Sequence, residues 1–93
     1  MGEADPRPDD WFVYLLRCRD GSLYAGISND VPARIQAHEE GRGARYTRGR
    51  GPFELVGSAG PFTRGDALRH ERALKRQSQR RKPDFLDGLA LEA

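Results

Sequence analysis

The chain has 93 residues, with 16 basic and 14 acidic side chains, 37% hydrophobic residues and one cysteine. This length allows one domain, which buries about 60 to 65% of the surface of its unfolded chain. A single cysteine excludes an internal disulfide, no apolar run approaches the roughly 20 residues that span a bilayer, and the acidic start does not resemble a signal peptide. We therefore expect a cytoplasmic protein with no membrane association.

Basic residues are concentrated in one part of the chain. Residues 41–82 hold 12 Lys or Arg and three acidic residues, a net charge of +9, whereas the rest of the chain holds 4 basic and 11 acidic residues, a net charge of −7. This asymmetry favours binding of a polyanion, for which nucleic acid is the usual candidate. A solvated basic face has the same composition and is the alternative.

The first predicted elements are an arm and a β-hairpin. Residues 1–10 are acidic and contain proline, which is typical of a flexible arm. Residues 11–18 and 22–27 are rich in aromatic and β-branched side chains and predict two strands. Asp20 and Gly21 between them predict a hairpin turn.

Helices and a third strand follow. Asn29 and Asp30 favour the N-cap of a helix, and Pro32 falls in its first turn. This pattern predicts a short helix over residues 31–40. A Gly/Arg-rich loop and a strand over residues 53–59 come next, and then a helix over 63–79 that begins with a capping-box pattern. A last helical segment is expected at 83–91.

These elements predict an α+β fold in the order β-β-α-β-α-α. We expect one domain over residues 11–91, a small α/β sandwich whose three-stranded, mostly antiparallel sheet is flanked by helices.

The type of turn determines where the two tyrosines of the hairpin point, because strand side chains alternate between faces. A two-residue loop would place Tyr14 and Tyr24 on opposite faces. A three-residue loop with a left-handed Gly21 pairs Tyr24 with Leu16 and puts Gly26 opposite Tyr14, leaving room above the sheet. The other face then carries only apolar side chains, those of Trp11, Val13, Leu15, Leu23, Ala25 and Ile27. This clean separation favours the three-residue turn.

Two predicted helices carry a charged residue on an inward-facing stripe. Helical spacing places Arg34 beside His38 on the first helix, and Glu71 on one stripe with Ser78 on the second. Burying an unpaired charge costs several kcal/mol, so each charge needs a partner or a ligand. The alternatives are that Arg34 and Glu71 pair with each other, that they cap a carbonyl, or that they bind a ligand. The two tyrosines, likewise, are either core residues with satisfied hydroxyls or parts of a site.

Together these residues resemble the GIY-YIG nucleases, above all the small stand-alone bacterial members. More distant similarity extends to the incision domain of the excision-repair subunit UvrC and to the amino-terminal domain of phage homing endonucleases. Phe12-Val13-Tyr14 stands where the family has GIY, and Tyr24-Ala25-Gly26 where it has YIG. Arg34 matches the family's helical arginine and Glu71 its metal-binding glutamate. The run GARYTRGRGP, residues 43–52, resembles a loop of the stand-alone members.

The resemblance covers residues 11–82 and includes departures. Phe12 replaces the first glycine, Ala25 replaces an isoleucine, and Ile27 stands where several members have lysine. The late asparagine of some members has no clear counterpart. These departures concern substrate contact and catalytic strength rather than the fold.

The resemblance implies a divalent-metal-dependent endonuclease that hydrolyses DNA, directed by structure or damage as in repair or recombination. Glu71 would hold one Mg²⁺ or Mn²⁺ ion through a single carboxylate and several waters. Arg34 would bind the scissile phosphate bidentately. The general base would be Tyr24 or Tyr14. Our choice is Tyr24, with Tyr14 orienting the water and His38 assisting. His38 is the rival base, because a free phenol has a pKa near 10; alternatively, it is a helix-end histidine bonded to the backbone.

The basic residues after the first helix are the expected nucleic-acid contact. Loop glycines let the backbone approach phosphates, and Tyr46, followed by Thr47, offers a ring for stacking on an unpaired base. A flexible solvated loop is the alternative. Without a base-reading pattern, we expect a monomer that binds DNA rather than RNA by structure or charge, with protein partners left open. The contact residues are Arg42, Arg45, Tyr46, Arg48, Arg50, Lys75 and Arg76, extended by Arg80, Arg81 and Lys82.

Two functions other than an enzyme fit parts of the sequence. A nucleic-acid-binding module that cleaves weakly or not at all fits the departures, but it has no need of a carboxylate facing phosphate. A protein-interaction adaptor would need an exposed apolar patch, which the sequence does not locate. The two histidines and Cys18 form no zinc set, and neither HExxH nor a phosphate-binding P-loop occurs. Cys18 is expected to pack in mid-strand as a small hydrophobe.

Overall fold

The computed structural model describes residues 10–92, so the predicted arm lies outside it except for Asp10. Strands β1 (Trp11–Arg17), β2 (Leu23–Ser28) and β3 (Glu54–Phe62) form one antiparallel sheet in the order β2-β1-β3. The helices are α1 (Val31–Glu39), α2 (Arg64–Arg76), α3 (Lys82–Glu92) and the short 3₁₀ helix η1 (Arg45–Thr47). The predicted α+β class is confirmed.

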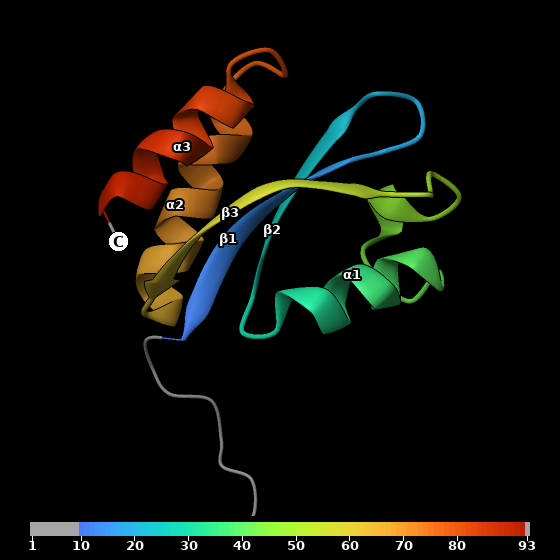
Figure 1. Ribbon diagram of the computed structural model, residues 1–93, viewed down its shortest axis with the longest axis horizontal. Helices are drawn as coiled ribbons and strands as arrows, with labels where there is room; N and C mark the ends of the chain where they lie inside the picture. The colour runs from blue at the N-terminus through green and yellow to red at the C-terminus, as the bar shows by residue number, and fades with distance from the viewer. Residues whose placement is uncertain (1–9, 93) are drawn as a thin grey trace, which may run out of the picture.

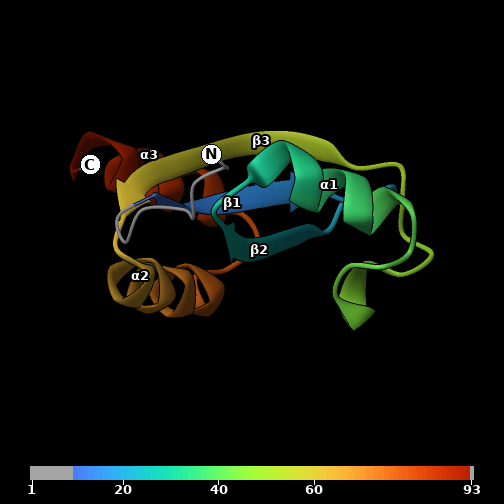
Figure 2. The ribbon, with the colours of Figure 1, turned by 90° about the horizontal axis from the view of Figure 1, so that it is seen from below.

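Helices cover both faces of the sheet (Figures 1 and 2). α2 and α3 pack together on one side, where α2 contacts β1 and β2 and α3 contacts β3. α1 lies on the other side and contacts β2. The edge strand β2 is therefore the element that both α1 and α2 contact, although these helices are far apart in the sequence. No helix of the described residues is long and apolar enough to cross a membrane.

The hairpin has the predicted register. Tyr14 pairs with Gly26 and Leu16 pairs with Tyr24, so both tyrosines share one face of the sheet. The opposite face packs against α2 and α3 and forms the core, which includes Val13, Leu15, Leu23, Ala25, Leu74 and Leu86. Because the apolar face is used by the core, the tyrosine face is left for α1.

The loop that sets this register has three residues. Cys18 donates its amide hydrogen to the carbonyl of Ser22 (2.8 Å), and Gly21 donates to the carbonyl of Cys18 (2.9 Å). Gly21 has φ +88°, a left-handed conformation that glycine adopts at little cost. The hydroxyl and amide of Ser22 both donate to Asp20 and hold the pKa of that carboxyl below its usual value. Cys18 is buried as expected, but it begins the turn rather than lying in mid-strand, because β1 ends at Arg17.

The third strand is longer than predicted. It runs over Glu54–Phe62 rather than 53–59 and includes Gly60 and Pro61. The register with β1 shifts at this point, so β3 has an extra residue there. A bulge on an edge strand tolerates proline, whose missing amide hydrogen would disrupt a central strand.

The second long helix is shorter than predicted. α2 ends at Arg76, and Gln77 is its extended C-cap. Beyond it, the side-chain amide of Gln79 binds the backbone of Leu23 on β2, accepting at 2.7 Å and donating at 3.4 Å. This contact holds the chain next to the sheet edge. Ser78 is exposed in the connection, so its predicted place on an inward-facing helical stripe is wrong.

The turn conformation predicts opposite effects of alanine at two glycines. Gly21→Ala should lower the free energy of unfolding by about 1 to 2 kcal/mol, because a side chain is unfavourable in the left-handed region. Gly88 lies within α3 with open space where a Cβ would stand, so Gly88→Ala should raise it by roughly 0.5 to 1 kcal/mol. Urea unfolding followed by circular dichroism measures both. A Gly21→Ala midpoint equal to that of the parent chain would contradict the three-residue turn.

Candidate active site

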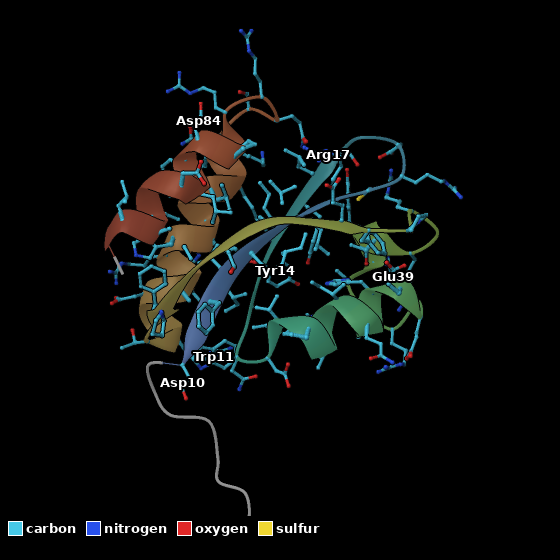
Figure 3. The ribbon with its side chains drawn as sticks, in the orientation of Figure 1. Asp10, Trp11, Tyr14, Arg17, Glu39 and Asp84 are labelled. Carbon is cyan, nitrogen blue, oxygen red and sulfur yellow. The ribbon has the colours of Figure 1, made fainter. Side chains whose placement is uncertain are left out.

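Tyr14 lies at the centre of the tyrosine face, between the strands and α1 (Figure 3). It belongs to the central strand and is 1% exposed. Its ring lies across Gly26, where a Cβ would meet the phenolic oxygen at 2.5 Å. The glycine of the second motif therefore accommodates the ring of Tyr14 itself, and the predicted space above the sheet is filled.

The hydroxyl of Tyr14 is hydrogen-bonded to His38 of α1. The distance from Tyr14 Oη to His38 Nε2 is 2.8 Å, and on the other side of the ring His38 Nδ1 lies 2.8 Å from Thr47 Oγ1. His38 is 2% exposed, and its ring lies edge-on to that of Tyr24 at 5.4 Å between centroids. Both ring nitrogens bind side chains, so the alternative of a helix-end histidine bonded to the backbone is wrong.

Burial dominates the electrostatics of this pair. It raises the pKa of Tyr14 to about 12; the neighbouring Tyr24 acts in the same direction, and the Arg34 guanidinium beside the hydroxyl acts in the opposite one. Burial, and secondly Arg34, hold the pKa of His38 below its usual value. Both groups are therefore neutral at pH 7. The carboxylate of Glu71 also raises the pKa of Tyr14, so it lies within electrostatic reach of the hydroxyl.

Arg34 and Glu71 approach Tyr14 from two different helices. The Glu71 side chain is 15% exposed and forms a 3.3 Å ion pair with Lys75, one turn further along α2. The Lys75 ammonium also lies 5.9 Å from the ring centroid of Tyr24. No ion pair joins Arg34 to Glu71 in the described range, which excludes the alternative that these two charges pair with each other.

The donor set around Glu71 limits which metal it suits. Among residues 10–92 there is no group of three His, Cys, Asp or Glu side chains that could hold a metal ion. A zinc site needs several such ligands, and a calcium site needs many oxygens. Mg²⁺, in contrast, is often held by one or two carboxylates and keeps most of its waters. A hydrated ion at Glu71 would be held by this one carboxylate, in competition with the Lys75 ammonium.

The Gly/Arg-rich loop is attached to the hairpin turn and to α1. Arg19 donates its amide hydrogen to the Arg50 carbonyl at 2.7 Å, and the Arg50 guanidinium pairs with Asp20 at 2.8 Å. Directly after the loop, the Phe53 amide donates to Glu39, at the end of α1 in Figure 3, at 2.9 Å. These contacts argue against the flexible solvated loop that the sequence left open.

Tyr46 already has stacking partners in the free protein. Its ring is nearly parallel to that of Tyr24, with 5.9 Å between centroids, and the Arg50 guanidinium lies 4.3 Å from its centroid. The residue is 42% exposed. An unpaired base that stacks on Tyr46 has to compete with these two contacts.

The chain is similar to known proteins over most of its length. A model of the GIY-YIG catalytic domain matches residues 10–84. The chain belongs to the GIY-YIG family. It is 55% identical over 76 residues to a UPF0213 protein of Nitratidesulfovibrio vulgaris, covering 82% of this chain and 66% of that protein. It is 44% identical over 86 residues to a UPF0213 protein of Cronobacter sakazakii, covering 91% and 90%.

A solved structure agrees with this assignment. The solution NMR structure of the UPF0213 protein BH0048 from Bacillus halodurans is 44% identical to this chain, with a TM-score of 0.52 and coverage of 83% of this chain and 82% of that one. The resemblance to the GIY-YIG family inferred from four motifs is thus confirmed. A GIY-YIG catalytic domain is typical of nucleases and implies binding of nucleic acid.

The other predicted contact residues of this GIY-YIG domain fall into three groups. Arg42 is exposed and pairs with Glu40. Lys82 was predicted wrongly, because it is 7% exposed and its ammonium donates to the carbonyl of Gln77. The remaining members are exposed: Arg45, Arg48, Lys75, Arg76, Arg80 and Arg81.

Sequence reasoning assigned Lys75 to the nucleic-acid surface and did not find the role of Thr47. Lys75 is exposed, as that assignment requires, and it also pairs with Glu71, four residues earlier on α2, and lies near Tyr24. Thr47 gave no signal, because its contact with His38 depends on how the loop folds back over α1.

The neutral, buried state of His38 predicts a pH dependence of folding stability. The folded pKa is below the roughly 6.5 of an exposed histidine, so the unfolded chain binds the proton more readily. The stabilisation is therefore complete above about pH 6.5 and is lost as the pH falls toward the lower folded value. Guanidinium unfolding between about pH 5.5 and 7.5 should show this decline, and His38→Gln should flatten it. An equal slope in both proteins would contradict a neutral His38.

Proposed function

We propose that this protein is a divalent-metal-dependent endonuclease that hydrolyses phosphodiester bonds of DNA, directed by the structure or damage of its substrate, as in repair or recombination. The proposal is supported above all by Tyr14, which is hydrogen-bonded to His38. Arg34 and Glu71, from two different helices, both affect the pKa of its hydroxyl. Phosphodiester hydrolysis needs an acceptor for the proton of a water, a cation at the phosphate and stabilisation of the leaving oxygen. A structural core needs none of these charges.

Arg34 is the residue that binds the scissile phosphate. A guanidinium offers two parallel hydrogen bonds to phosphate oxygens, which fixes the phosphate as well as neutralising it. In the free protein Arg34 lowers the pKa of both Tyr14 and His38, so it stands next to the groups that handle the proton. Lys75, between Glu71 and Tyr24, adds a second positive charge near the same phosphate.

Tyr14 and His38 together remove the proton from the attacking water. A phenol with a pKa of about 12 is a poor base by itself, but Tyr14 has a neutral imidazole as its hydrogen-bond partner. As the water oxygen bonds to phosphorus, its proton moves to Tyr14 Oη and the tyrosine proton moves to His38 Nε2. The bond from phosphorus to the leaving oxygen breaks, and that oxygen takes a proton from solvent. The hydrogen bond favours Tyr14 over Tyr24 as the bridge, and leaves Tyr24 to orient the water.

Glu71 is the residue that holds the metal ion. When bound, a divalent cation neutralises charge at the phosphate and at the leaving oxygen. The carboxylate is partly exposed, which leaves access for hydrated Mg²⁺ or Mn²⁺. Its ion pair with Lys75 holds the side chain in place before an ion arrives.

DNA is expected to lie along the basic residues of the loop and of α2. Residues 41–82 carry a net charge of +9, which favours contact with phosphates, and binding should weaken as salt rises. These side chains show no base-reading pattern, which supports selection by structure rather than by sequence.

Cleavage by two conservative variants tests the proposal. Glu71→Gln and Arg34→Lys should each lower the rate on labelled single-stranded, duplex and branched DNA by about 100-fold or more. Glu71→Gln removes the negative charge that would hold the metal ion, and Arg34→Lys keeps the positive charge but loses the bidentate hydrogen bonds to the phosphate. Glu54→Gln changes a carboxylate that pairs with Arg17 at the surface and is the matched control; it should cut normally. Activity should require Mg²⁺ or Mn²⁺ and stop with a chelator.

Two results would contradict the proposal. Cutting that persists in both variants would show that Arg34 and Glu71 do not form the active site. No cutting by the parent chain, with salt-sensitive DNA binding retained, would support the alternative of a binding module, consistent with the departures at Phe12, Ala25 and Ile27.

A further inference from the structure

Thr47 is a buried residue of the Gly/Arg-rich loop whose hydroxyl contacts two polar groups at once. Its Oγ1 lies 2.8 Å from the carbonyl oxygen of Ala44 and 2.8 Å from Nδ1 of His38. The residue is 1% exposed, so it does not contact nucleic acid at the surface. Any effect of Thr47 on chemistry must therefore act through His38.

The two contacts determine where the hydrogens lie. Each of these two hydrogen bonds needs one hydrogen atom between its donor and its acceptor. The threonine hydroxyl has a single hydrogen, so it can donate in only one of them. A carbonyl oxygen has no hydrogen to donate, so the hydroxyl hydrogen points to Ala44. The hydrogen between Oγ1 and Nδ1 then comes from the imidazole of His38. The ring is therefore protonated on Nδ1.

This protonation sets the direction of the bond to Tyr14. A neutral imidazole with hydrogen on Nδ1 has a bare Nε2, and this atom faces the Tyr14 hydroxyl at 2.8 Å. Tyr14 is therefore the donor and His38 the acceptor. In the opposite tautomer, Nε2 would donate to Tyr14 and could not take its proton.

The loop packs closely around the Thr47 contact. The backbone of Gly43 lies against the imidazole, and a Cβ there would clash with His38 Nδ1. Thr47 also closes η1, with its amide donating to Ala44 at 3.0 Å. The arginines expected to contact DNA are therefore part of the same loop as the residue that orients the proton acceptor.

We propose that Thr47 is a positioning residue that holds His38 in the tautomer with hydrogen on Nδ1, so that Nε2 can take the proton that Tyr14 passes on from the attacking water. After this transfer both ring nitrogens carry hydrogen, and the imidazolium returns the Nε2 proton to solvent through Tyr14. The catalytic part of this inference rests on the proposed function, whereas the tautomer is a property of the free protein.

Two variants and a spectroscopic measurement test this inference. Thr47→Val keeps the shape of the side chain and removes the hydroxyl, and Thr47→Ser keeps the hydroxyl. The ¹⁵N chemical shifts of the His38 ring, measured at neutral pH without DNA, identify which nitrogen carries hydrogen. We expect hydrogen on Nδ1 in the parent chain and in Thr47→Ser, and a shift toward Nε2 in Thr47→Val. Cleavage should fall roughly 100-fold in kcat for Thr47→Val, with KM for DNA unchanged and with rescue in Thr47→Ser.

The outcomes separate this inference from the proposed function. Hydrogen on Nε2 in the parent chain would overturn it, whether or not Thr47→Val folds. A Thr47→Val protein that keeps the parent tautomer would also overturn it, and so would one in which only KM for DNA changes and kcat does not. If the tautomer shifts as expected but neither the parent chain nor the variants cut DNA, Thr47 sets the tautomer of His38 as inferred, and the proposed nuclease activity is contradicted.

Discussion

The buried hydrogen bond between Tyr14 and His38 is the interaction on which the rest of the site depends. Both residues are nearly inaccessible to water, and either polar group would be costly to bury without the other. The bond also joins the central strand to α1, and through Thr47 it continues into the Gly/Arg-rich loop. Within residues 10–92 no buried side-chain nitrogen or oxygen lacks a hydrogen-bond partner, so every buried polar side-chain atom of this network is satisfied.

The hairpin turn makes this hydrogen bond possible. Its extra residue at Gly21 brings Tyr14 and Tyr24 to one face and leaves the other face to the apolar core. A shift of one residue would place Tyr24 in the core and remove it from His38. Gly26 lets the Tyr14 ring lie over β2, and the edge position of β2 lets both α1 and α2 contact it. A GIY-YIG site is thus a consequence of strand register as much as of its charged residues.

Much of this was predictable from the sequence, and the remainder depended on contacts between distant segments. Alternation of apolar residues and the position of Gly21 were sufficient for the register, and helical spacing was sufficient to place Arg34 and Glu71 on inward faces. The end of α2 was misjudged because Gln79 binds the backbone of β2, a contact that no local pattern encodes. Thr47 was missed for the same reason, since its role arises only when the loop closes over His38.

The most direct test of the account is a crystal structure of the Glu71→Gln chain with a short DNA oligonucleotide. We expect one phosphate of the backbone to be bound to the Arg34 guanidinium, next to the Tyr14 hydroxyl, with neighbouring phosphates along the arginines of the loop. DNA bound elsewhere, with no phosphate within hydrogen-bond distance of Arg34, would contradict the claim that these buried and half-buried groups form a single site for phosphodiester hydrolysis.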